Sequence, residues 1–263
     1  MRSLRRSFSW VGSLVAGLAL FLGLLAAPAC AALVSEEEVA REAEKAFQQM
    51  RARIPISRDL AARDYVACIA GSIIAQLEEP YRSLDWEIEL FDQKSANAFA
   101  MPGGKIGVFT GIFDVAKSQD SLAAVIGHEI AHVTAQHSLK RARKKIRNNL
   151  LAAAAAGVLG GGRGTANALG LGAEVGLGLP FDRKQEKAAD LEGLRLMARA
   201  GFDPRASIGL WKNMAKQNQA SPPAFLSTHP ATEGRIDGLI SELASSLVLY
   251  NEAHQLGRLP VCE

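Results

Sequence analysis

The sequence has almost no surplus of charge and no internal repeat, and each absence excludes a class of function. Three of its 30 Lys and Arg residues are Arg2, Arg5 and Arg6, and the others equal the 27 Asp and Glu residues in number. Beyond that N-terminal segment the chain is electrically balanced, which argues against nucleic-acid binding. It has no 34-residue repeat that would form a platform for partner proteins. Because 48% of residues are hydrophobic and 22% charged, wholesale disorder is also excluded.

Histidine is scarce too, yet two of the five histidines stand four residues apart in His128-Glu129-Ile130-Ala131-His132. The surrounding apolar residues recur at helical spacing, so both imidazoles project from one helix face and can bind one metal ion. Glu129 lies about 100° further round the helix, where it can accept a proton from a water molecule. This combination is typical of a zinc hydrolase. The alternative is a metal-free helix with an incidental histidine pair.

A third protein ligand is needed, because two histidines do not hold a catalytic zinc ion. Metzincins would have a histidine at position 138 and a glycine at 135, and the Ser138 and Ala135 found here exclude that class. A second helical pattern offers Glu186 and Asp190, again four residues apart. If Glu186 binds the metal, Asp190 can accept the N–H of a ligating histidine. Taken alone the pair is more typical of a solvated helix face, but an incomplete metal site favours the ligand interpretation.

Four separated motifs occur in a fixed order: Asn97 to Gly104, Ile126 to His132, Glu186 to Asp190, and Thr228-His229-Pro230 followed by Arg235. Together they resemble metallopeptidase family forty-eight over roughly residues 35 to 245. The resemblance implies one Zn²⁺ per chain, bound by His128, His132 and Glu186, with Glu129 as the base and Asp190 behind a ligand. It also implies that His229 lies near the metal, where it steadies an oxyanion or fills the water position of a latent enzyme.

An alternating strand is predicted over residues 86–91, followed by two short strands, 97–101 and 105–110, joined by a turn. A strand just before the metal-binding helix can pair with an extended peptide through an open edge, although a fully paired hairpin is the alternative. The expected substrate-binding residues are Asn97, Ala98, Phe99, Ala100 and Arg235. The resemblance implies misfolded or stalled envelope proteins as substrates. The rival function is a latent protease that acts as a metal-stabilised chaperone or assembly factor for outer-membrane proteins.

Residues 1–31 are predicted to be an export signal, with a basic start, an apolar run from Trp10 to Ala27 and small residues around Cys30. This predicts a periplasmic protein. Lipidation of Cys30, a twin-arginine signal and an uncleaved anchor remain open. Cys68 and Cys262 are then left as a pair that either forms a disulfide in an oxidising compartment or remains as two thiols.

The helix that carries His132 is expected to continue through His137 into a basic run at 140–147, with His137 turned away from the ligand face and exposed. This run either approaches anionic lipid head groups or an acidic partner, or is a solvated helix end, and the solvated end is favoured. Residues 148–180 form an Ala/Gly-rich insert that is either a lid over the site or a packing hairpin.

The expected fold is α+β and mainly α, a zincin-like metallopeptidase domain over residues 32–250 with a small sheet packed on the helix of His128. A final helix is predicted from Pro230 to about Leu249. Residues 251–263 are predicted to be a tail, in which His254 receives no role.

Overall fold

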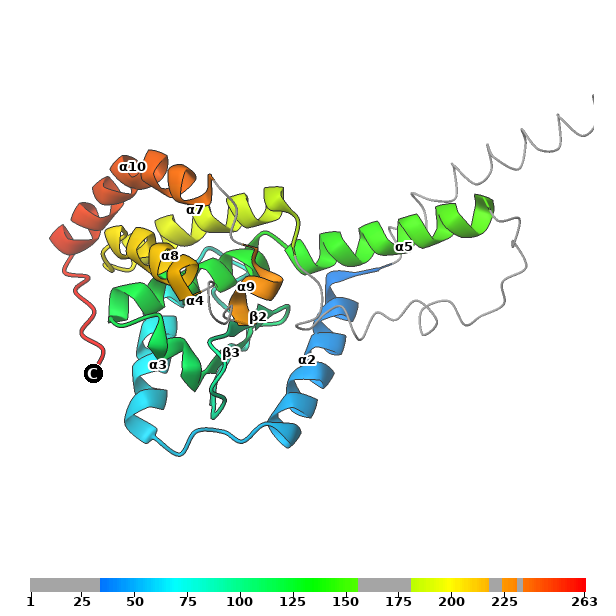
Figure 1. The fold of residues 1–263 in the computed structure, drawn as a ribbon, viewed down its shortest axis with the longest axis horizontal. Helices are drawn as coiled ribbons and strands as arrows, with labels where there is room; N and C mark the ends of the chain where they lie inside the picture. The colour runs from blue at the N-terminus through cyan, green and yellow to red at the C-terminus, as the bar shows by residue number, and fades with distance from the viewer. Residues whose placement is uncertain (1–33, 156–180, 218–223, 231–233) are drawn as a thin grey trace, which may run out of the picture.

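The computed structural model describes residues 34–155, 181–217, 224–230 and 234–263 (Figure 1). The predicted export signal, the lipidation site at Cys30 and most of the 148–180 insert lie outside these residues. Within them the chain is mainly helical with one small sheet, which confirms the predicted fold class. Among the described residues, no helix combines the length and apolar character that a membrane span requires.

The sheet has three strands, β1 (Glu87–Phe91), β2 (Ala98–Met101) and β3 (Lys105–Phe109), in the order β1-β3-β2. β1 runs parallel to β3, and β2 runs antiparallel to it. The predicted hairpin is therefore present, and β2 is an edge strand. A short 3-10 helix, η1 (Thr110–Asp114), leads from β3 towards the central helix.

The central helix is α4 (Gln119–Thr134), which contains both histidines of the metal-binding motif. Ser118 caps it by accepting a hydrogen bond from the Ser121 amide, and every residue from Leu122 to Val133 is buried. α3 (Leu60–Ile74) and α7 (Arg183–Arg199) both pack against α4, and α7 begins with a capping box between Asp182 and Gln185. The predicted metal-binding motif thus lies on a helix that is buried over most of its length.

Two glycines bring α4 and α7 unusually close together. A Cβ atom on Gly193 would lie 2.7 Å from the His128 backbone nitrogen, and one on Gly127 would lie 2.9 Å from the Gly193 carbonyl oxygen. Side chains at these positions would force the helices apart. This close contact sets the distance between the helix of His128 and the helix of Glu186.

A second core lies under α2 (Glu36–Arg53), where Phe47 packs against the aromatic rings of the sheet. α5 (His137–Ala155) contributes Leu139 and Ile146 to this core and then extends away from the body of the protein (Figure 1). The expected continuous helix from α4 into α5 was wrong. Gln136 has a positive φ of 53°, which ends one helix and redirects the next.

The C-terminal region differs from the prediction at both ends. After α8 (Arg205–Gln217) and the short α9 (Ala224–Thr228), α10 begins at Arg235 rather than Pro230, because Gly234 stands before it with a φ of 93°. α10 ends at Gln255, so the helix continues into the predicted tail, and His254 Nε2 lies 3.0 Å from the Gly201 carbonyl oxygen.

The last residues are attached to the start of α4. The Gln119 side-chain amide donates to the Pro260 carbonyl oxygen at 3.0 Å and accepts from the Cys262 amide at 3.1 Å. Cys262 is joined by a disulfide to Cys68 on α3, which is one of the two arrangements expected for this pair. The C-terminal segment therefore connects α3 to α4 through both covalent and hydrogen bonds.

Candidate metal centre

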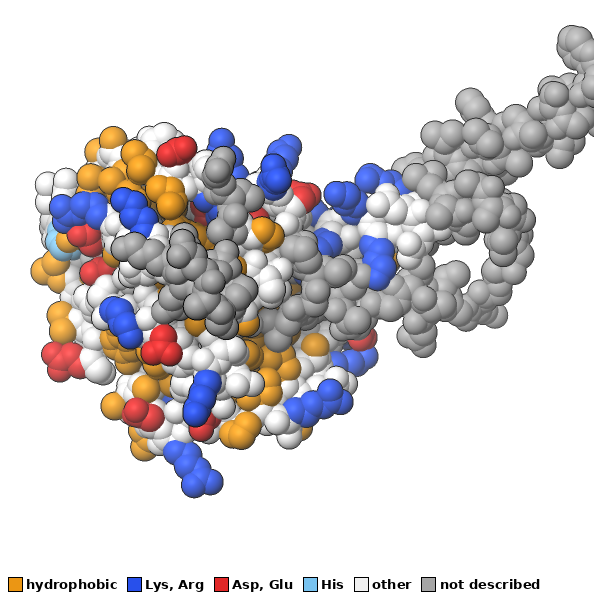
Figure 2. Space-filling model, viewed as in Figure 1, with side chains coloured by type: hydrophobic (Ala, Val, Ile, Leu, Met, Phe, Trp, Pro, Cys, Tyr) orange, Lys and Arg blue, Asp and Glu red, His pale blue; other side chains and the backbone are white. Residues whose placement is uncertain are grey.

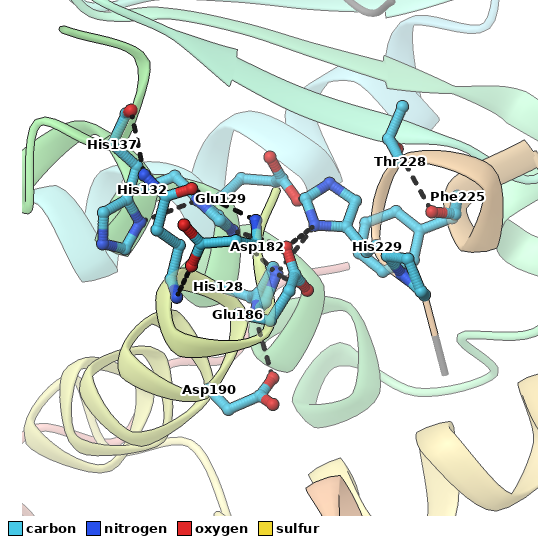
Figure 3. A network of polar contacts seen from close by, with 12 residues as sticks. His128, Glu129, His132, His137, Asp182, Glu186, Asp190, Phe225, Thr228 and His229 are labelled. Atoms are coloured by element: carbon cyan, nitrogen blue, oxygen red, sulfur yellow. Dashed lines mark hydrogen bonds and ion pairs between the residues drawn. The ribbon is translucent and has the colours of Figure 1, made fainter. Parts of the chain in front are cut away.

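Four buried side chains converge on one point between α4, α7 and α9 (Figure 3). On α4, the His128 and His132 rings point the same way, with their Nε2 atoms 3.1 Å apart. From α7, the Glu186 carboxylate lies 3.6 Å from His128 Nε2 and 3.5 Å from His132 Nε2. Helical spacing places the two histidines on one face of α4, and the packing of α7 against α4 brings in Glu186, which is 58 positions from His128.

His229, directly after α9, is the fourth member of the cluster. Its Nδ1 atom lies 3.1 Å from His128 Nε2 and 3.0 Å from Glu186 Oε1. Its ring stacks on Phe225 with centroids 4.4 Å apart, and only 2% of the residue is exposed. The potential ligand atoms of all four residues lie within 4.8 Å of one another.

The donor atoms present fit a zinc ion. His128 Nε2 faces two other ring nitrogens, each at 3.1 Å. A ring nitrogen offers either one hydrogen or one lone pair, so His128 can make a good hydrogen bond with only one of these neighbours. A cation that accepts the lone pairs removes this conflict, and the nitrogen and carboxylate donors are those of four-coordinate zinc sites. Burial lowers the pKa of His132 well below its usual value, which keeps its ring neutral and able to donate a lone pair.

A buried ion-pair network supports the cluster from behind. Asp190 Oδ1 lies 3.1 Å from His128 Nδ1, the position from which it can fix the ring's tautomer. Arg235 donates two hydrogen bonds to the Asp190 carboxylate at 2.5 and 2.7 Å, and its Nη1 lies 2.8 Å from Glu186 Oε2. The guanidinium also stacks over the Trp211 ring, 3.7 Å from its centroid. Arg235, expected to bind substrate, is therefore buried against the two acids.

These contacts keep the two acids charged. Burial by itself raises the pKa of Asp190, but the hydrogen bonds from His128 and Arg235 outweigh it and hold that pKa below its usual value. Burial likewise raises the pKa of Glu186, and its contacts with His132 and His229 reverse the shift strongly. Both carboxylates are therefore ionised and offer negative charge to a cation.

His137 was expected to be exposed, and this was wrong. It is 3% exposed, and its Nδ1 atom lies 2.9 Å from His132 Nδ1. The left-handed residue Gln136 breaks the helix, so the next residue turns back towards the ligand face instead of continuing round α4. Gln185 holds this turn by donating to the His137 carbonyl oxygen at 3.2 Å. No signal in the spacing of the motif reveals this position, since a continuous helix places it elsewhere.

The tautomers of this histidine pair follow from the geometry. His132 directs Nε2 at the cluster, so its hydrogen is on Nδ1 and is donated to His137 Nδ1. His137 must then be neutral, with its own hydrogen on Nε2. Burial, the largest effect, lowers the pKa of His137 to about 4, which agrees with a neutral ring.

Glu129 lies beside the cluster without joining it. Its Oε2 atom accepts a hydrogen bond from the Ala100 amide at 3.2 Å, and its Oε1 atom faces His229 Nε2 at 3.3 Å. Burial raises the pKa of this carboxyl group. The predicted base is therefore held between the edge strand and His229.

The residues expected to bind substrate divide into two groups. The Phe109 amide donates to the Asn97 carbonyl oxygen, so alternate backbone groups of β2 point towards β3. The backbone groups of Ala98 and Ala100 therefore point away from β3, along the outer edge of the sheet. Phe99 pairs with Gly107 and packs its ring among Phe47, Phe91 and Phe109, so it contributes to the core in place of the expected substrate contact. Asn97 is buried too.

A family model described as peptidase family M48 matches residues 61–243, which include every residue of the cluster. The chain belongs to this family. It is 39% identical over 175 residues to the mitochondrial metalloendopeptidase OMA1 of Schizosaccharomyces pombe, covering 65% of this chain and 50% of that protein. It is 30% identical over 202 residues to the beta-barrel assembly-enhancing protease of Yersinia pestis, covering 72% of this chain and 40% of that protein. The chain thus spans half or less of the length of these relatives.

Proposed function

We propose that this chain is a zinc-dependent endopeptidase. The observation that carries the proposal is the convergence of His128, His132 and Glu186 on one point beside the carboxylate of Glu129. These three residues would hold the metal. When bound, zinc supplies Lewis acidity, which polarises the carbonyl group of the scissile peptide and makes a water molecule more acidic.

Glu129 performs the proton transfers. Its carboxylate takes a proton from the attacking water and returns it to the leaving nitrogen. The Ala100 amide fixes one of its oxygens, and burial raises its pKa, which suits a group that must both accept and release a proton. His229 Nε2 lies 3.3 Å from the other carboxylate oxygen of Glu129, and it can donate a hydrogen bond to the negative charge that develops on the substrate carbonyl oxygen.

The outward edge of β2 is the proposed binding site for an extended substrate. An added strand would use the backbone groups of Ala98 and the carbonyl oxygen of Ala100, while the Ala100 amide keeps its hydrogen bond to Glu129 and so connects this edge directly to the base. A peptide in this position presents its backbone to the metal cluster. The substrates are therefore unfolded or locally extended protein chains.

The test is the substitution Glu129→Gln, with Glu252→Gln on the exposed face of α10 as the matched control. We expect the Glu129 variant to bind zinc as the parent does and to lose at least about 100-fold in casein cleavage, since it removes the general base. The control should cleave at the parental rate. Unchanged cleavage by Glu129→Gln would show that the assigned mechanism is wrong.

We further propose that the enzyme works in the periplasm on misfolded or stalled envelope proteins. Two observations support this: the export signal predicted over residues 1–31, and a relative named beta-barrel assembly-enhancing protease. Partners in outer-membrane protein assembly follow from the same name. Fractionation of cells that express the full chain is the test, and recovery of the mature protein in the cytoplasm would contradict it.

The contacts of His229 favour a second candidate, a latent protease that acts as a metal-stabilised chaperone or assembly factor. Its Nδ1 atom is close enough to His128 and Glu186 to fill the fourth metal position. If His229 blocks the fourth metal position, His229→Ala raises peptidase activity. If His229 is instead an oxyanion donor, the same substitution lowers peptidase activity. Incubation of the zinc-loaded protein with an unfolded substrate separates the functions, because chelator-sensitive fragments indicate a protease and suppressed aggregation without fragments indicates a chaperone.

A further inference from the structure

The first half of α5 has two chemically different sides. The whole helix, residues 137–155, includes six Lys or Arg residues and no Asp or Glu. Leu139, Ala142 and Ile146 are buried on one side, and Lys140, Lys144 and Arg147 are exposed on the other. The apolar side is thus used in packing against the second core, and the cationic side is presented to the surroundings. Figure 2 shows Lys and Arg side chains gathered where α5 leaves the body.

A pocket of about 460 Å³ lies between this cationic side and the start of α7. Lys140, Lys144 and Lys184 line it together with Arg141, and Asp182 is the one acidic residue among the described residues of its lining, 3.8 Å from Lys144 Nζ. Positive charge therefore predominates in the lining. Lysine ammonium groups bind phosphate as point charges, and this volume is within the range of small-molecule sites.

The chain enters the fold beside the same surface. The Arg143 guanidinium donates to the Val34 carbonyl oxygen through Nε at 3.1 Å and Nη2 at 3.0 Å, so Val34 is fixed against α5. The preceding sequence contains the apolar run from Trp10 to Ala27 and Cys30, for which an uncleaved membrane anchor and lipidation are two of the alternatives left open by the sequence. A membrane attachment in the segment just before Val34 would therefore act at the same end of the molecule as the cations of α5. Membrane binding through a single weak anchor is reversible, and it becomes stable when a basic surface provides a second contact with the membrane.

We propose that the surface formed by Lys140, Lys144, Arg147 and Lys184 docks on an anionic phospholipid bilayer, with a phosphodiester head group in the pocket between α5 and α7. This inference is independent of the proposed peptidase function. His137 lines the same pocket and contacts His132 on its other side, so docking would hold the metal cluster close to the membrane surface.

The experiment is co-sedimentation of the full chain with vesicles of phosphatidylglycerol and phosphatidylcholine or of phosphatidylcholine alone. The test variant is Lys140→Gln/Lys144→Gln/Lys184→Gln, and the matched control Arg53→Gln/Arg58→Gln/Lys212→Gln removes the same charge from exposed positions elsewhere. Each cation near an anionic surface strengthens binding about fivefold, so the test variant should bind anionic vesicles on the order of 100-fold more weakly. The control should bind like the parent, and neutral vesicles should not distinguish the three proteins.

Replacing the same three lysines by arginine should preserve binding, since the interaction needs charge, and added salt should weaken it. Casein cleavage without vesicles should be the same in parent and test variant, so a failure of the docking proposal is distinguishable from a failure of the peptidase proposal. Equal binding of the parent to both vesicle types, or an equal loss in the control, would overturn the proposal. So would calorimetric binding of inorganic phosphate without any preference for anionic vesicles, which would identify a soluble-anion site.

Discussion

Gly193→Ala tests whether the contact between α4 and α7 sets the geometry of the metal centre. The new methyl group would lie 2.7 Å from the His128 nitrogen, 2.8 Å from its Cα and 2.9 Å from the Gly127 carbonyl carbon. All three neighbours are backbone atoms of a buried helix and cannot rotate away. Carbon atoms at contact prefer about 3.5 Å or more, so the helices must separate by roughly 0.7 Å.

That displacement is larger than the roughly 0.5 Å within which a metal or catalytic constellation tolerates movement. Glu186 moves away with α7 while the two histidines stay with α4. We therefore expect zinc to bind at least about tenfold more weakly, a loss of about 1.4 kcal/mol. Overpacking should also lower the free energy of unfolding of the metal-free protein by about 1–3 kcal/mol.

Zinc affinity is measured by competition with a chromogenic chelator, and stability by urea unfolding of metal-free protein, since bound metal stabilises the folded state by mass action. Gly209→Ala on α8 is the control, because its methyl group would meet nothing within 4 Å. That change should be neutral or stabilising by up to about 1 kcal/mol. If Gly193→Ala retains both the parental zinc affinity and, within about 0.5 kcal/mol, the parental stability, the spacing argument is refuted.

Three further substitutions test other parts of the structure. His137→Phe removes the acceptor for the N–H of His132 and should weaken zinc binding about 10- to 100-fold in the same competition assay, while parental affinity would reject the positioning role. Asp190→Asn leaves the buried guanidinium of Arg235 with fewer charged partners and should lower the free energy of unfolding by about 3–5 kcal/mol in urea, which an unchanged midpoint would contradict. Cys262→Ser opens a disulfide that spans 194 residues and should cost up to about 5 kcal/mol. The parent treated with reductant should show the same loss, and equal stability with and without reductant would contradict it.

The sequence was sufficient for features that depend on local periodicity. The spacing of His128 and His132, and that of Glu186 and Asp190, fixes which side chains share a helix face, because the helix has a constant turn. The strand pattern and the turn at Gly103 and Gly104 likewise predicted the hairpin, since both glycines take the positive φ that such a turn needs.

Features that depend on a single backbone angle or on packing between distant segments were not predictable. His137 was assigned to the exposed side because the helix was taken as continuous, and the one φ value at Gln136 reverses that conclusion. The register of β2 decides whether the Phe99 side chain faces the core or the opposite side of the sheet, and this register is known only from the pairing of Phe99 with Gly107. The ion pairs of Arg235 need the relative placement of α7 and α10, which no local pattern contains.

The wide separation of the centre's components along the chain has a consequence for when the protein can act. Glu129 is anchored by Ala100, whereas Asp190 is held by Arg235, so a molecule that is still being synthesised lacks the complete centre until α10 has emerged. Synthesis from the N-terminus therefore delays completion of the centre until the residues of α10 are available. Under the proposed peptidase function, a nascent copy would therefore be unable to cleave neighbouring unfolded chains before that point.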